Sequence, residues 1–199
     1  MNKVLIVSRT RMTNGICVGG INIDNNTFVR LHDERGGNLS TDAPYQIGEI
    51  WNLQLDAPWN PRELPHVEDK MVKLAVKLQN VTDISSYIRS LGVPIYEGDL
   101  GIIFEGSLKY TLRGKPFIND EMVPPNSVCF WIPDANIVPV EQFGKIVYKY
   151  KNRLLPYVGF QDYITIAAGT LVRMSLANWW QPEDSEDERR CYVQLSGWY

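Results

Sequence analysis

Lysines and tyrosines alternate in one stretch of the second half of the chain, KIVYKYKNR (145–153). Proteins that bind single-stranded nucleic acid combine a basic groove for the backbone with aromatic rings for the bases, and this stretch has both. Its candidate binding residues are Lys149, Tyr150, Lys151 and Arg153. On a strand, however, neighbouring side chains point to opposite faces, which would separate the lysines from the tyrosines. That pattern is equally typical of an edge strand whose lysines oppose aggregation, so both interpretations stay open.

Arginines follow the first apolar segment and recur after the second. The segment SRTRMTNG (8–15) places Arg9 and Arg11 among hydroxyl side chains, where guanidinium groups could bind phosphate through paired hydrogen bonds. In FVRLHDERGGN (28–38), Arg30 lies on the polar side of an alternating pattern, although two acidic residues follow it. We therefore count Arg9, Arg11 and Arg30 as candidate ligand-binding residues. An exposed polar loop without a ligand is the alternative for the first segment.

Charge is segregated along the chain, although the formal net charge is only −3. Residues 1–23 and 142–161 together hold seven basic residues and no acidic one. The other 13 basic residues are outnumbered by 23 acidic ones. We expect the two basic windows to converge on one face, where they would form a groove for nucleic acid.

Few residues in the sequence are suited to enzymatic catalysis. Cys17 and His32 lie on neighbouring strands of a predicted hairpin, so a cysteine-dependent hydrolase is a remote alternative. All three cysteines lie in apolar, strand-like runs without a C-x-x-C pair, which favours buried thiols over a metal site. The glycine-rich phosphate and dinucleotide motifs are absent from the sequence. We expect a protein that is no enzyme and has no cofactor and no metal.

An acidic tract, EDSEDE (183–188), separates the last two predicted strands. We interpret it as a solvated hairpin loop that keeps a sheet edge soluble. Weak binding of divalent cations there stays open.

Strand patterns dominate the elements that would position these residues. Short alternating or β-branched segments recur throughout, bounded by Gly, Pro or polar turns, and they include KVLIVSR (3–9), EIWNLQLD (49–56) and DYITIA (162–167). One short helix is expected in DISSYIRSLG (83–92), with Asp83 as its N-cap. This pattern predicts an all-β protein of small barrels. No apolar run approaches the roughly 18 residues needed to span a bilayer, so we expect no membrane contact and a cytoplasmic location.

Aromatic residues gather close to the C-terminus. TLVRMSLANWW (170–180) and RRCYVQLSGWY (189–199) predict two paired strands, of which the second closes a barrel. Trp179 and Trp180 are adjacent, so on a strand they would face opposite sides, and one of them would cover a domain interface or bind a ligand.

Several of these motifs occur together in a known family. An apolar strand followed by SRT, then GICVGG, FVRL and YQIGEIW, with TLVRMSLANWW and RCYVQLSGWY near the other end, resembles the dual OB-containing domain family. The resemblance implies two oligonucleotide/oligosaccharide-binding (OB) barrels, which we place at residues 1–95 and 96–199. The family is linked to bacterial defence and conflict systems.

The resemblance implies a non-enzymatic recognition module. Its ligand would be single-stranded DNA or RNA, or a nucleotide-derived molecule, and it would serve as a sensing or targeting component beside an effector protein. The alternative function is a protein interaction scaffold that uses the aromatic surface, with the basic windows incidental.

Overall fold

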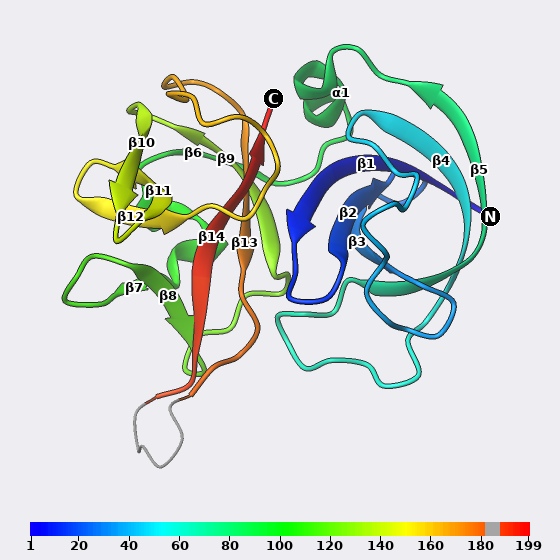
Figure 1. The fold of residues 1–199 in the computed structure, drawn as a ribbon, viewed down its shortest axis with the longest axis horizontal. Helices are drawn as coiled ribbons and strands as arrows, with labels where there is room; N and C mark the ends of the chain where they lie inside the picture. The colour runs from blue at the N-terminus through cyan, green and yellow to red at the C-terminus, as the bar shows by residue number, and fades with distance from the viewer. Residues whose placement is uncertain (182–187) are drawn as a thin grey trace. The chain divides into compact units, whose positions relative to one another are not determined.

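The computed structural model describes residues 1–181 and 188–199, so most of the acidic tract lies outside the described residues. The chain forms two compact units (Figure 1). Unit 1 comprises residues 1–63 and 67–94, and unit 2 comprises residues 64–66 and 95–199. The two basic windows therefore belong to different units, and their convergence stays a prediction. No helix in the described residues combines the length and the apolar character needed to cross a membrane.

Unit 1 is a closed barrel in which the strands follow the order β1-β2-β3-β5-β4. β1 pairs with β4 to close the barrel, and β3 pairs in parallel with the start of β5. The elements of this unit are β1 (Asn2–Arg11), β2 (Ile16–Asn22), β3 (Thr27–His32), β4 (Glu49–Asp56), β5 (Asp69–Asn80) and α1 (Ile84–Ser90). A five-stranded Greek-key barrel is the architecture of the OB fold.

The alternation seen in the sequence decides which side chains fill this barrel. Val29 and Leu31 of β3 and Val18 of β2 point into the core, so Cys17 and Arg30 are directed outward. Cys17 is consequently half-buried on the outer face, and the expectation of a fully buried thiol at this position is wrong. Cys129 and Cys191 are buried as expected.

The predicted helix is confirmed as α1. Asp83 caps it by accepting a hydrogen bond from the backbone N–H of Ser86 at 2.9 Å, and Ile88 is buried. Gly92 follows with a φ of +68°, a conformation that ends the helix with little strain because glycine has no Cβ.

Unit 2 contains two sheets around one core. A six-stranded sheet has the order β6-β9-β13-β14-β8-β7, and a three-stranded sheet has the order β10-β11-β12. The elements are β6 (Ile95–Gly98), η1 (Leu100–Ile102), η2 (Phe104–Gly106), β7 (Lys109–Tyr110), β8 (Pro116–Asn119), β9 (Val128–Pro133), β10 (Ile137–Gln142), β11 (Lys145–Tyr150), β12 (Arg153–Pro156), β13 (Val172–Leu176) and β14 (Arg190–Trp198). In the described residues these sheets form an OB-like half-barrel, and a bridge between Tyr157 and Leu195 joins them.

The C-terminal strand lies inside its sheet. β14 pairs with β13 on one side and with β8 on the other, which confirms the predicted pairing of the last two strands. Its residues Cys191, Val193 and Leu195 are fully buried. The continuous strand β13 ends at Leu176, and the pairing predicted as far as the tryptophan pair continues beyond it as an isolated bridge between Trp180 and Arg190. The predicted strand at 162–167 is wrong, because only Ile166 there is buried and it forms an isolated bridge with Ile137.

Candidate nucleic-acid interface

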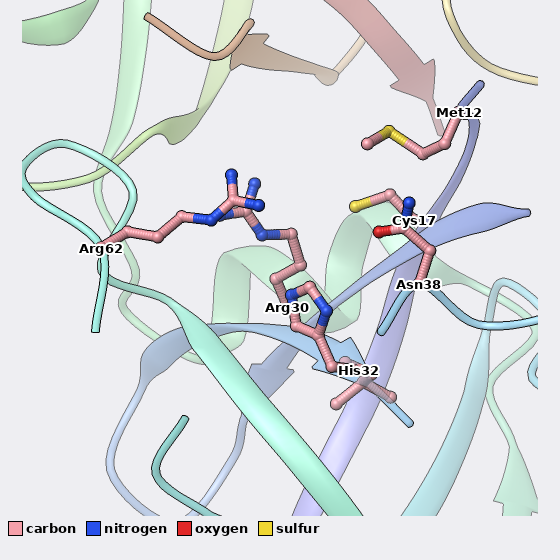
Figure 2. Close-up of a pocket in the computed structure, with 7 residues that line it drawn as sticks. Met12, Cys17, Arg30, His32, Asn38 and Arg62 are labelled. Carbon is pink, nitrogen blue, oxygen red and sulfur yellow. The ribbon is translucent and has the colours of Figure 1, made fainter. Parts of the chain in front are cut away.

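One carboxylate organises the outer face of the unit 1 barrel. Arg30 of β3 and Asp69 of β5 are direct partners across the parallel strand pair, and Arg30 Nε contacts Asp69 Oδ1. Arg62, from the loop between β4 and β5, places its Nε 3.2 Å from the other oxygen, Oδ2. Only 6% of the Asp69 side chain is exposed. Two guanidinium groups are thereby held beside each other by a single buried charge (Figure 2).

His32 completes this cluster. Its Nε2 lies 3.1 Å from Asp69 Oδ1, and its Nδ1 lies 3.2 Å from the carbonyl oxygen of Gly37. Burial alone would raise the pKa of Asp69, but the contacts with His32 and Arg30 outweigh burial and lower that pKa to about 2. Asp69 is therefore ionised at neutral pH, and one negative charge faces two permanent positive charges.

The two arginines line a small pocket on the outer face of β2 and β3. Met12, from the loop between β1 and β2, and Cys17, Leu31 and Asn38 complete its lining together with His32. Figure 2 shows the guanidinium groups of Arg30 and Arg62 side by side, with the Cys17 sulfur near them. Residues from β2, β3 and three connecting segments (β1–β2, β3–β4 and β4–β5) therefore converge here.

An exposed tryptophan lies in the same loop as Arg62. Trp59 is 80% exposed, although an indole ring gains free energy when it is buried. The other two candidate arginines of unit 1 lie on β1. Arg9 is half-buried and donates a hydrogen bond to the carbonyl oxygen of Thr41 at 3.1 Å, whereas Arg11 is exposed.

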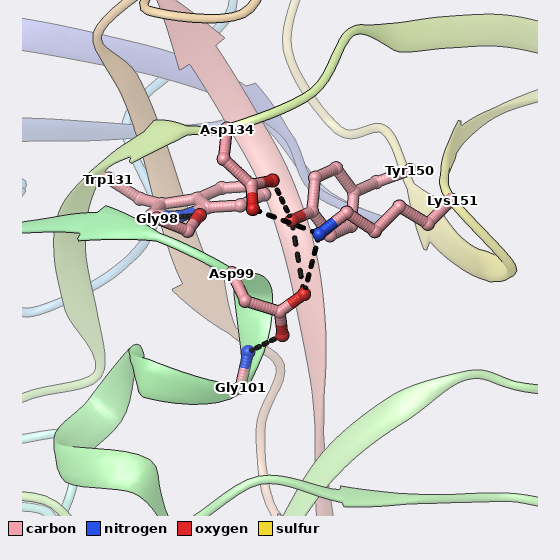
Figure 3. Close-up of polar contacts among 7 residues, drawn as sticks. All are labelled: Gly98, Asp99, Gly101, Trp131, Asp134, Tyr150 and Lys151. Atoms are coloured by element: carbon pink, nitrogen blue, oxygen red, sulfur yellow. Dashed lines mark hydrogen bonds and ion pairs between the residues drawn. The ribbon is translucent and has the colours of Figure 1, made fainter.

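In unit 2, the structure places Tyr150 in the core. Its ring is 1% exposed and packs edge-on against Trp131, with 4.9 Å between centroids. Its hydroxyl donates a hydrogen bond to Asp134 Oδ1 at 2.5 Å (Figure 3). Burial, together with that hydrogen bond, raises the pKa of Tyr150 to about 12. The faces of this ring are not accessible to a base in this conformation.

The basic candidates of unit 2 differ in the charge that they leave available. Lys151 bridges two carboxylates, with Nζ 2.9 Å from Asp99 and 3.0 Å from Asp134 (Figure 3). Arg153 lies over the ring of Tyr110, 3.7 Å from its centroid. Lys149 is exposed and forms no ion pair with a described residue. Of this group, Lys149 therefore offers the least compensated charge.

A comparison with protein families now identifies the architecture. The model of the dual OB-containing domain matches residues 2–198. The chain belongs to the dual OB-containing domain family. No curated protein and no solved structure matched the chain.

Within a dual OB-containing chain, the location of the arginine pocket is informative. OB barrels as a class bind nucleic acids, and they do so on the face of strands 2 and 3 and on the loops that join strands 1–2 and 4–5. These elements supply every lining residue of the unit 1 pocket except Asn38, which lies between β3 and β4. In the described residues, no cluster of three or more His, Cys, Asp or Glu side chains has the geometry to hold a metal ion.

The sequence of this dual OB-containing protein did not predict three of these residues, Arg62, Asp69 and Trp59. Arg62 and Trp59 lie in a proline-rich segment, APWNPRELP, that carries no strand or helix pattern. Asp69 is 39 residues from Arg30, and only the pairing of β3 with β5 brings the two together. The signal that the sequence offers is a tryptophan and an arginine together in one proline-rich segment.

Proposed function

We propose that the chain is a non-enzymatic module that binds single-stranded nucleic acid on the outer face of β2 and β3 in unit 1. The observation that carries this proposal is the pair of guanidinium groups held by Asp69 on that face. Arg30 and Arg62 each contact the Asp69 carboxylate through Nε, and the buried Glu68 also acts on Arg30, so the pocket offers guanidinium hydrogen-bond donors rather than a large net charge. Phosphate oxygens and base edges are the groups that arginine forks recognise best.

The two arginines have different parts in the proposed contact. The side chain of Arg62 is 40% exposed and can meet a ligand directly. Arg30 is more deeply placed, and its Nη2 atom is buried without a hydrogen-bond partner among the described residues. A buried guanidinium group of this kind adds positive potential to the face above it.

Trp59 provides the aromatic partner that a single strand requires. It precedes Arg62 by three residues in the loop and is largely exposed. Stacking of a base on an aromatic ring contributes about 1–3 kcal/mol and tolerates any sequence. We therefore expect weak sequence preference and clear discrimination against duplexes, whose bases are already stacked.

The geometry at His32 supports a role without catalysis. A cysteine nucleophile needs a histidine nitrogen within reach as its base. Both ring nitrogens of His32 are directed elsewhere, towards Asp69 and the carbonyl of Gly37. Neither is left for Cys17, so a hydrolase is the less favoured proposal.

By analogy with the family, we place the module in the bacterial cytoplasm as a sensing or targeting component of a defence system, working beside an effector protein. A protein interaction scaffold is the second candidate. Leu74, Val76 and Leu78 on β5 favour it, because these three large apolar side chains are about half exposed and share one face of the strand.

Fluorescence anisotropy with labelled oligonucleotides tests the proposal. We expect the protein to bind a 20-nucleotide deoxythymidine or uridine strand more tightly than a duplex of equal length. Arg62→Ala should weaken that binding by about tenfold, in keeping with the loss of a charge-assisted contact. Arg89→Ala, which removes an exposed arginine from the last turn of α1, is the matched control and should change the affinity little. Equal losses in both variants, or no measurable binding by the parent, would reject the site.

A further inference from the structure

The hairpin of β10 and β11 turns on two residues, Phe143 and Gly144. Gln142 and Lys145 are the last paired residues of the two strands, and both turn residues have positive φ, 52° and 71°. Such a turn matches the twist of the strands it joins and is usually formed by Asn-Gly. A bulky residue at the first position is unusual, because its Cβ crowds the backbone when φ is positive.

No contact of the Phe143 side chain with the described part of the chain offsets the free-energy cost of this backbone conformation. Its side chain is 90% exposed, so the ring gains almost no burial. The backbone conformation costs free energy, and a ring that stays exposed on folding recovers none of it through burial. Asparagine would avoid that backbone cost, which points to a use for the ring outside the fold.

The charges next to the turn indicate what the ring meets. Lys145 and Lys149 are exposed on the outer face of β11, and neither forms an ion pair with a described residue. Glu141 is exposed too, but it pairs with Ile146 and so belongs to the opposite face of the hairpin. One face therefore presents two cations, and an aromatic ring lies at its end.

We propose that Phe143 stacks on a base of single-stranded nucleic acid while Lys145 and Lys149 contact its phosphates. The identity of the ligand rests on the function proposed above, whereas the contact itself lies in unit 2 and is independent of the arginine pocket. A single ring flanked by lysines matches one base and its backbone. A protein partner would need a larger apolar surface than one side chain provides.

Phe143→Asn separates this role from a structural one. We expect the variant to be more stable than the parent, with an unfolding midpoint higher by roughly 2–4 °C, because asparagine tolerates the turn conformation. Its affinity for a uridine or deoxythymidine 20-mer should nevertheless fall, by roughly 5-fold to 150-fold if one stacked base is lost. Phe143→Trp should bind as well as the parent. Met122→Asn is the control, because it removes an apolar side chain of 53% exposure next to Glu121, whose carboxylate is paired with Lys109, so no uncompensated lysine is known beside it among the described residues.

Photo-cross-linking gives a second readout. A 20-mer carrying 5-iodouracil should cross-link to Phe143 on irradiation, and mass spectrometry of the digested complex would identify the peptide. Unchanged affinity in Phe143→Asn, or cross-links confined to residues 1–94, would overturn the inference. If Arg62→Ala abolishes binding while Phe143→Asn does not, the proposed function stands and this contact fails. If the parent binds no oligonucleotide, both are rejected.

Discussion

Arg30 and Asp69 are partners across the parallel pairing of β3 with β5, with a direct contact between Nε and Oδ1. This relationship joins one strand pairing of the barrel to the charge on the face that we propose binds a ligand. The strand pairing that completes the fold also positions the arginine, so stability and binding can be tested at the same residues.

Replacing Asp69 with asparagine should destabilise unit 1 by about 2–3 kcal/mol at pH 7. This destabilisation follows from the pKa of Asp69, which folding lowers from 3.8 to about 2. Since the folded pKa lies below the unfolded one, the stabilisation is complete above about pH 4 and is lost as the pH falls towards 2. Urea unfolding at pH 7 and at pH 2 should therefore show a difference between parent and variant that shrinks with acid. Asp56→Asn, at the exposed end of β4, should show no such difference.

Lys149 of β11 and Lys151, which directly follows that strand, should contribute unequally to binding. Lys149→Gln should lower the slope of log affinity against log salt by about 0.7, the value for one contact to a single strand. Lys151→Gln should leave the slope unchanged, because Asp99 and Asp134 already neutralise that lysine. Anisotropy titrations between low and high salt measure both slopes. A larger effect from Lys151 would mean that its two ion pairs open when the ligand binds.

Tyr150→Phe should reduce stability without affecting binding. The substitution removes the hydrogen bond that the Tyr150 hydroxyl donates to the Asp134 carboxylate, and such a loss typically costs about 1–3 kcal/mol. The ring itself stays in the core against Trp131, so the surface that a ligand meets is unchanged. Thermal unfolding and anisotropy on the same preparation test the two halves of this prediction. Weaker binding at unchanged stability would contradict it.

Cys17→Ser should change the free energy of unfolding by less than about 0.5 kcal/mol, because the side chain is half-buried on the outer face of the barrel. The buried Cys129 provides the contrast. Its burial raises the pKa of the thiol to about 12, and Cys129→Ser places a hydroxyl in an apolar site at a cost of about 1–3 kcal/mol. Urea unfolding of the two variants beside the parent measures the difference.

Deleting residues 190–199 should unfold unit 2. The deletion removes β14, and with it the partner of both β13 and β8. Backbone groups on two strands would lose their hydrogen bonds, and the buried positions of Cys191, Val193 and Leu195 would be empty. Circular dichroism and limited proteolysis should show loss of the segment that follows residue 94. Removal of Tyr199 alone leaves β14 complete and should preserve the fold.

Local pattern was sufficient for much of this fold. The alternation in TFVRLH places Val29 and Leu31 inside and Arg30 outside, as the structure confirms. The same reasoning at KIVYKYK leaves two interpretations, and the structure directs Tyr148 and Tyr150 into the core and the lysines outward. Side-chain direction follows from the two-residue period of a strand, which any short segment displays.

Long-range pairing was beyond the reach of the sequence. Asp69 joins Arg30 only because β5 lies between β3 and β4, an order that no local segment reveals. The half-barrel form of unit 2 likewise depends on which strands find partners, and the segment 162–167 looks like a strand although it forms only an isolated bridge. The sequence did not predict a role for Phe143, because that role was inferred from its positive φ, which residue type alone does not specify.

The short segment Leu64–His66 has a consequence for synthesis. It lies in the loop that carries Trp59 and Arg62, yet it packs in unit 2, where Trp179 Nε1 donates to the Leu64 carbonyl at 2.9 Å and Cys191 Sγ lies 3.7 Å from His66 Nε2. More than 100 residues separate the segment from those partners, so it leaves the ribosome long before they do. A nascent barrel of unit 1 therefore carries this loop between β4 and β5 before the partners of Leu64–His66 have been synthesised, and those contacts form only once the final strands are translated. A shortened gene that stops after the first barrel would not encode Trp179 or Cys191, so these two contacts could not form.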